Sequence, residues 1–147
     1  MNSALPPGSW KKVLVPTDFS DCARVALETT AAWHRDTGGA VVLLHVCEPG
    51  YEGLRVQTSG LHQQMEQAAR DELAQAQRVH FPQAENVRAL VVPGRPAETI
   101  CRVAAEEDVD AIVIPTHGHS GLARALLGSV AEKVVRHAPC SVLIVRE

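Results

Sequence analysis

The segment between Pro115 and Ser129 holds the residues of this chain that are best suited to binding chemistry. It begins Pro-Thr-His-Gly-His-Ser-Gly and ends Gly-Ser, where a helix is predicted to start. Glycines such as Gly118 and Gly128 let backbone N–H groups approach an anion, and a helix N-terminus adds unpaired N–H groups and a positive dipole end. The pattern indicates a phosphate-binding loop. The competing interpretation is that the glycines only turn the chain and that Gly128 with Ser129 only starts the helix.

Two histidines, His117 and His119, flank Gly118. A His-x-His pair can ligate zinc, but an open zinc site needs three protein ligands and no third ligand stands at a suitable spacing. We therefore expect polar loop histidines near a phosphate and no metal site. Arg95 and Arg124 could reach a triphosphate, because guanidinium forks suit phosphate oxygens. Exposed loop arginines without a ligand are the competing interpretation.

Sequence motifs of several enzyme classes are missing. There is no Gly-x-x-x-x-Gly-Lys-[Ser/Thr], no Gly-x-Gly-x-x-Gly after the first apolar run, and no Gly-x-Ser-x-Gly around Ser120. No catalytic dyad or triad can be assembled, and we can name no general base with a proton to take. The sequence favours a binding protein over an enzyme, with phosphoryl or adenylyl transfer as a third hypothesis.

Five short apolar runs, each of strand length, must position these residues: 12–16, 40–46, 87–92, 111–115 and 141–145. None alternates strictly with polar residues, which is typical of a parallel sheet covered on both faces. Helical periodicity appears between them at 20–35, 60–79, 96–107 and 129–137. The second of these helices is predicted to bury one face made of Leu61, Met65, Ala68, Ala69, Leu73, Ala76 and Val79.

This alternation predicts an α/β fold, a single-domain three-layer sandwich with helices on both faces of a parallel sheet. In such a sheet ligands bind beyond the carboxyl ends of the strands, where the strand order reverses. The segments to examine are therefore those that follow each strand. After the first strand comes Asp18, and at the end of the second lie His45, interpreted as a structural strand-end histidine, and Cys47.

Composition sets the wider limits. The chain has 147 residues, 46% of them apolar and 21% charged, with a net charge of -3, which fits one globular domain. Aromatic residues make up 3%, too few for the stacking platforms of single-stranded nucleic-acid binders, so nucleic acid is not an expected partner. No apolar run reaches the roughly 18 residues of a membrane span. Residues 1–10 read as a flexible lead-in without a signal peptide, and four cysteines without Cys-x-x-Cys spacing suggest reduced thiols in the cytoplasm.

Several motifs together resemble the universal stress protein family. The family signature is Gly-x2-Gly-x9-Gly-[Ser/Thr], and Gly118, nine residues and Gly128-Ser129 match its second part in register. The opening Val-Pro-Thr-Asp that ends at Asp18 and the closing His-Ala-Pro-Cys that ends at Cys140 are similar to the family as well. The resemblance covers residues 11–146, nearly the whole chain.

The resemblance implies a Rossmann-like fold in which a five-stranded parallel sheet of order 3-2-1-4-5 carries four helices, with residues 11–147 forming the domain. It also implies a cytoplasmic stress-response protein, a nucleotide-sensing homodimer or adaptor paired through the last strand, 141–145. ATP would lie between the first and fourth strands, with Mg²⁺ or Mn²⁺ held through its phosphates and at most slow hydrolysis. The implied binding residues are Pro16, Thr17, Asp18, Val46, Ile114, Pro115, Gly118, His119, Gly128, Ser129 and Val130.

Pro115 departs from the family pattern, because it stands where the signature has its first glycine. Proline has no N–H to donate and a fixed φ, so a phosphate or ribose contact would be lost there. This departure favours the alternative function, a universal stress protein that binds no nucleotide and acts as a dimeric protein-interaction module. If adenine does bind, the scarcity of aromatic residues predicts that aliphatic groups such as Val46 and Ile114 hold its ring.

Overall fold

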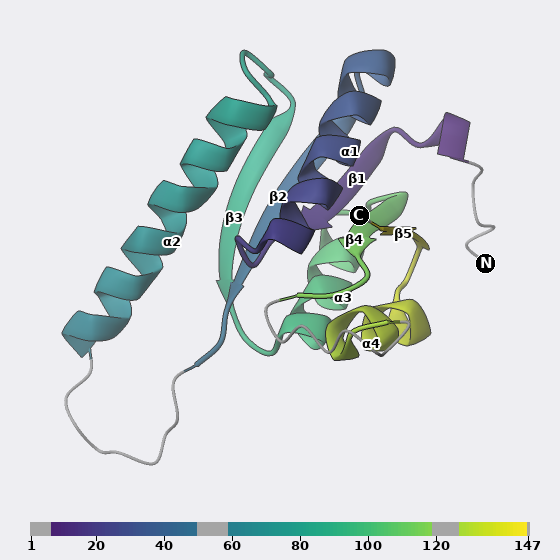
Figure 1. The fold of residues 1–147 in the computed structure, drawn as a ribbon. Helices are drawn as coiled ribbons and strands as arrows, with labels where there is room; N and C mark the ends of the chain where they lie inside the picture. Colours follow the sequence, from purple (N-terminus) through teal and green to yellow (C-terminus); the bar gives the residue numbers. More distant parts are fainter. Residues whose placement is uncertain (1–6, 50–58, 119–126, 147) are drawn as a thin grey trace.

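The computed structural model describes residues 7–49, 59–118 and 127–146. Five parallel strands form one sheet of order β3-β2-β1-β4-β5, which confirms the predicted fold (Figure 1). After a short 3-10 turn, Pro7–Ser9, the elements follow in this order: β1 Lys12–Pro16, α1 Asp21–Thr37, β2 Ala40–Cys47, α2 Ser59–His80, β3 Val87–Pro93, α3 Pro96–Glu106, β4 Ala111–Pro115, α4 Ser129–His137 and β5 Ser141–Val145. Each strand agrees with its predicted range to within one residue.

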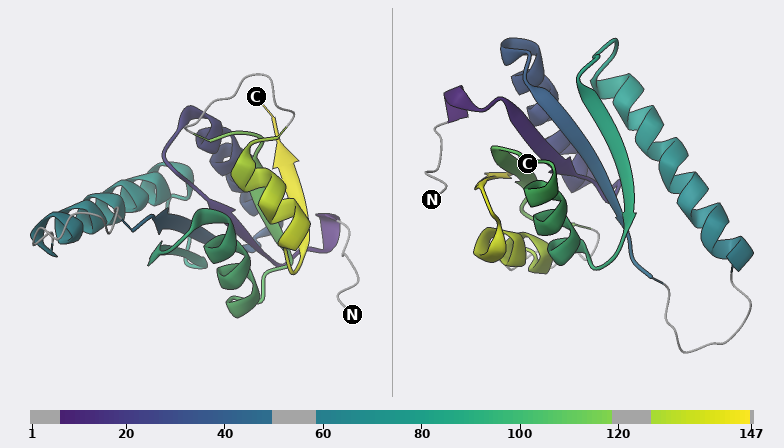
Figure 2. Two further views of the ribbon diagram at one scale, coloured as in Figure 1. Left: turned by 90° about the horizontal axis from the view of Figure 1, so that it is seen from below. Right: turned by 180° about the vertical axis from the view of Figure 1, so that it is seen from behind.

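Alternate residues of the central strands enter two separate apolar cores, one on each face of the sheet. Val13 and Val15 of β1 pack with α1 and α2, while Leu14 between them packs with α3 and α4. The helices therefore form two layers around the sheet (Figure 2). Because both faces of β1 are covered, its residues are apolar without alternation, as the sequence pattern indicated.

The face that α2 buries differs from the prediction. Ala69 and Leu73 are buried, but Leu61, Met65 and Val79 are 59%, 61% and 60% exposed. This helix has 22 residues, about 33 Å at 1.5 Å per residue. Figure 1 shows its N-terminal half extending past the sheet, which accounts for the exposure of Leu61 and Met65. Val79, at the other end of the helix, lines a hollow between α1 and α2.

The amino-terminal edge of the sheet is held by charged groups. Lys12 Nζ lies 3.0 Å from Glu107 Oε2, and Arg88 Nη1 lies 3.0 Å from the same oxygen. The Asp110 carboxylate accepts hydrogen bonds from the backbone N–H groups of Lys11 and Lys12, at 2.7 and 3.0 Å. These contacts fix the start of β1 against the turn that leads into β4, far from the carboxyl edge.

Trp10 belongs to the domain rather than to a loose lead-in. Its side chain is 8% exposed and joins the core on the α1 and α2 side. A buried indole of this size anchors the chain directly before β1 to the core.

Candidate functional site

The sheet splits between β1 and β4 at its carboxyl edge. These strands pair only at Val13–Ala111 and Leu14–Ile112. Beyond this point β1 continues to pair with β2 as far as Pro16, and β4 continues with β5 as far as Pro115. The strand order reverses at this place, so the split is where an open parallel sheet binds its ligand.

The loop after β1 is held by three side-chain to backbone hydrogen bonds. Thr17 Oγ1 accepts the Phe19 N–H at 3.0 Å, and Asp18 Oδ1 accepts the Ser20 N–H at 3.0 Å. Ser20 Oγ then accepts the Ala23 N–H at 3.2 Å and is the N-cap of α1. The loop thus reaches the helix in a defined conformation that fixes the Asp18 carboxylate at the split.

Two glycines close the loop that follows β4. An added Cβ on Gly118 would lie 2.7 Å from Asp18 Oδ2, closer than real Cβ contacts. The Gly128 N–H donates to Thr116 O at 2.6 Å, and a Cβ on Gly128 would lie 3.1 Å from that oxygen. Both signature glycines therefore stand where the chain leaves little room for a side chain, and their part in binding a ligand stays a prediction.

The N-terminus of α4 opens next to this closure. Gly128 is its N-cap and, having no side chain, satisfies none of the first N–H groups of the helix. Ser129 follows as an exposed first residue, and Val130 is half-buried. In the described part of the chain no side chain caps this end of the helix, and the N–H groups of a helix N-terminus are suited to a phosphate that reaches across from the split.

Of the other residues predicted to bind the ligand, some lie beside the split and others do not. Pro16 and Pro115 are buried on the two sides of the split. Val46 is half-buried near the end of β2, whereas Ile114 is 4% exposed within the α3 and α4 core, so its side chain does not form a wall of the split. His119 lies outside the described residues, as does Arg124.

His45 has the structural role that the sequence indicated, and its partner is the loop after β1. Its Nδ1 lies 2.8 Å from Thr17 O; because a carbonyl only accepts, this nitrogen carries the proton. Phe19 stacks on the His45 ring with centroids 4.5 Å apart, although its φ of 63° is one that bulky residues seldom adopt. In the sequence, this role is indicated by a histidine near the carboxyl end of an apolar strand.

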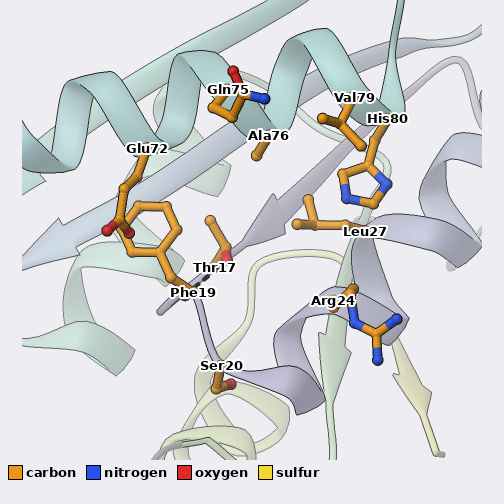
Figure 3. A pocket seen from close by; sticks show the side chains of 10 residues that line it. All are labelled: Thr17, Phe19, Ser20, Arg24, Leu27, Glu72, Gln75, Ala76, Val79 and His80. Atoms are coloured by element: carbon orange, nitrogen blue, oxygen red, sulfur yellow. Dashed lines mark hydrogen bonds between the residues drawn. The ribbon is translucent and has the colours of Figure 1, made fainter.

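A hollow of about 270 Å³ lies between α1 and α2, beside the loop after β1 (Figure 3). Its apolar lining includes Phe19, Leu27 and Ala76, and Glu72 and His80 come from opposite ends of the stretch of α2 above it. It shares Thr17, Phe19 and Ser20 with the loop but includes neither signature glycine. The loop after β1 therefore borders both this hollow and the split.

Cys47 ends β2, and Arg95 precedes α3. Burial, the largest cause, raises the pKa of the Cys47 thiol, and the Glu66 carboxylate raises it further while Arg70 opposes it. Arg95 is exposed and lies 3.5 Å from Glu98.

In the described ranges, no three His, Cys, Asp or Glu side chains are grouped as a metal site would need. None of the helices described is both long enough and apolar enough to cross a membrane.

Comparison with known proteins agrees with this fold and loop. The model of the universal stress protein family matches residues 9–146, so the chain belongs to that family. Universal stress protein MJ0577 of Methanocaldococcus jannaschii is 30% identical, with 93% of this chain and 95% of that protein covered. Its solved structure superposes with a TM-score of 0.83 at 31% identity over 93% and 96% of the two chains.

Other solved structures share the fold. The universal stress protein UspA of Lactobacillus plantarum has a TM-score of 0.82 at 26% identity, covering 92% of this chain and 97% of its own. A universal stress protein in complex with cAMP has a TM-score of 0.66 at 24% identity, covering 92% and 96%. One from Archaeoglobus fulgidus in complex with dAMP has a TM-score of 0.64 at 23% identity, covering 90% and 95%. The fold is thus one that holds adenine nucleotides in some proteins.

Proposed function

We propose that this protein binds ATP in the split between β1 and β4 and acts in the cytoplasm as a nucleotide-sensing stress protein. The observation that carries the proposal is the pair of close approaches at Gly118 and Gly128, which bring Asp18, Thr116 and the α4 N-terminus together. Such an arrangement leaves backbone groups and a helix N-terminus available to ribose and phosphates. The cAMP and dAMP complexes of other proteins with this fold are consistent with it.

Any Mg²⁺ or Mn²⁺ would arrive with the nucleotide. The metal would be held through the phosphates, and the Asp18 carboxylate, which the described loop brings to the split, would border the adenine and ribose. The proposal assigns no catalytic residue to the protein. Hydrolysis, if measured, would be slow and incidental to binding.

The experiment is a ligand-retention measurement followed by titration. Protein purified without added nucleotide should show excess absorbance at 260 nm, and chromatography of the heat-released ligand should identify an adenine nucleotide. Protein stripped of ligand should bind ATP with magnesium in a calorimetric titration, with a dissociation constant below about 1 mM, or about -4 kcal/mol. Absence of binding at millimolar ATP would contradict the proposal.

The second candidate function is a dimeric interaction module, and the two edge strands of the sheet bear on it. At one edge β3 carries exposed Arg88 and ends in exposed Pro93, both of which discourage edge pairing. At the other edge β5, Ser141–Val145, contains neither a charge nor a proline, and all its side chains are half-buried. A second copy pairing with β5 would cover this strand, and such a homodimer is compatible with either function.

A further inference from the structure

Helix α2 carries a stripe of residues that the rest of the domain does not cover. Helical positions three and four residues apart share a face, and one such series runs along the whole helix beside its buried face. Its three large apolar members are exposed by 59%, 61% and 60% at Leu61, Met65 and Val79. The α2 stripe consists of Leu61, Met65, Ala68, Glu72, Gln75 and Val79. Apolar side chains gathered in this way on a surface indicate a contact with another molecule.

The two halves of the α2 stripe have different surroundings. Its C-terminal half borders the hollow between α1 and α2, into which Leu27 of α1 and Val79 of α2 both face (Figure 3). Its N-terminal half lies on the part of the helix that extends past the sheet (Figure 1). Leu61, Met65 and Ala68 there form a projecting apolar ridge. One helix therefore carries both a ridge and one wall of a hollow.

The ridge and the hollow have similar lengths. The α2 residues that line the hollow run from Glu72 to His80, about 12 Å of helix at 1.5 Å per residue. The ridge runs from Leu61 to Ala68, about 11 Å by the same measure. The ridge of one molecule is thus as long as the hollow of another.

The α2 stripe is also symmetric about its centre. If two copies of α2 lie antiparallel with a two-fold axis at the level of Arg70, every stripe position faces a stripe position of the other copy. The ridge of each copy then lies on the hollow of the other, as in an isologous contact. The facing pairs are Leu61 with Val79, Met65 with Gln75, and Ala68 with Glu72.

We propose that the α2 stripe is a self-association surface, on which a second copy of this chain docks antiparallel with its ridge on the hollow. A second copy fits because it supplies a ridge and a hollow at the same spacing, so one two-fold contact covers both. Helix α2 packs on β2 and β3, at the opposite end of the sheet from β5. This surface is therefore separate from the proposed dimer edge, and its role does not depend on nucleotide binding.

The contact is small, and it carries like charges near its axis. Each copy contributes two large apolar side chains of the ridge and Val79, far fewer than the 20–30 residues a side of a stable interface. The two Glu72 carboxylates come near the axis and repel each other, although the small Ala68 opposite each one leaves it access to water. We expect a dissociation constant of about 100 μM. At about 10 μM the contact is mostly dissociated, so sedimentation of Ile144→Pro at that concentration reports on the β5 edge alone.

The first experiment is sedimentation equilibrium of the full chain between about 10 μM and 1 mM. The average mass should rise by more than half over this range, whatever species is present at the lower end. Leu61→Glu in the ridge and Val79→Lys beside the hollow should each weaken this association at least about tenfold, because each places a charge in an apolar contact. Thermal unfolding should not change, since both side chains are exposed.

Val135→Glu is the matched control for this experiment. Val135 is 48% exposed on α4, which covers the other face of the sheet, so the association should stay that of the wild type. A wild-type mass that does not change with concentration overturns the proposal. Unchanged association in Leu61→Glu or in Val79→Lys overturns it as well.

The second experiment combines the two substitutions in one chain. Leu61 and Val79 are about 27 Å apart along α2, so the two new charges cannot pair within a molecule. Across the two-fold axis each new carboxylate faces the new ammonium group of the other copy. The double variant Leu61→Glu/Val79→Lys should therefore recover an association within about threefold of the wild type, and 1 M salt should remove the recovery. A double variant as weak as either single variant overturns the antiparallel docking.

Discussion

The Asp18 carboxylate and Gly118 approach each other so closely that any side chain at position 118 would displace the acid. A Cβ there would lie 2.7 Å from Asp18 Oδ2, and Asp18 itself is held by its bond to the Ser20 N–H. The loops after β1 and β4 are therefore matched to each other across the split. A substitution at Gly118 should therefore alter the position of Asp18.

Replacing Gly118 by valine should abolish nucleotide binding. The branched side chain would displace Asp18 and occupy space at the split, while both cores remain intact, so thermal unfolding should stay close to that of the wild type. Calorimetric titration with ATP and a thermal melt measure the two effects. Gly60→Ala in α2 is the control, since a Cβ there meets nothing within 4 Å. Wild-type affinity in Gly118→Val would contradict the assignment of this loop to the ligand.

Replacing Ile144 by proline should convert the proposed dimer into monomers. The Thr116 N–H donates to Val145 O, so Ile144 has its N–H on the outer side of β5, where a second copy would pair. Proline removes that donor and leaves the bonds to β4 in place. Sedimentation measures the mass. Leu143→Pro is the contrasting variant, because its N–H faces β4 and its loss should lower stability as well. A dimer that persists in Ile144→Pro would exclude this edge.

Replacing Glu107 by glutamine should destabilise the fold by about 1 kcal/mol, since two cations then share a neutral partner. The Glu107 side chain is 16% exposed and accepts from both Lys12 and Arg88. Denaturant unfolding measures the change. Glu132→Gln removes an exposed pair with Arg136 and should cost less than about 0.5 kcal/mol. Nucleotide affinity should not change in either variant, because neither contact lies at the split.

Stability should fall in alkaline solution through Cys140. Burial, with smaller contributions from Cys101 and Asp110, raises the pKa of this thiol from 9.0 to about 11. The unfolded chain therefore loses the thiol proton before the folded one does, and stability present below about pH 9 is lost as the pH rises towards 11. Unfolding midpoints across that range should fall less steeply in Cys140→Ala than in the wild type. Parallel curves would exclude this thiol as a source of the pH dependence.

The strands were predictable because the apolar runs are unbroken, as sheets covered on both faces require, and their order was implied by the family resemblance. The buried face of α2 was not, since periodicity says which residues share a stripe and not how far the sheet extends beneath it. Leu61 and Met65 therefore fit the stripe and yet remain exposed. Trp10 was missed for a related reason, because one apolar residue among prolines and glycine has no period at all.

The signature spacing singles out Gly118 and Gly128, and their part in binding stays a prediction. Their close approaches to Asp18 and Thr116 could not be predicted, because they join segments that the sheet brings together. The hydrogen bond between His45 and Thr17 likewise depends on the pairing of β1 with β2.

Both tryptophans lie on one side of the molecule. Trp10 belongs to the core beside α1 and α2, and Trp33 packs against that same core, while the core beside α3 and α4 has none. Intrinsic tryptophan fluorescence therefore reports on the unfolding of the layer that contains α1 and α2. Circular dichroism reports on the loss of all the helices. Agreement or disagreement between the two signals during unfolding will reveal whether the two layers separate together.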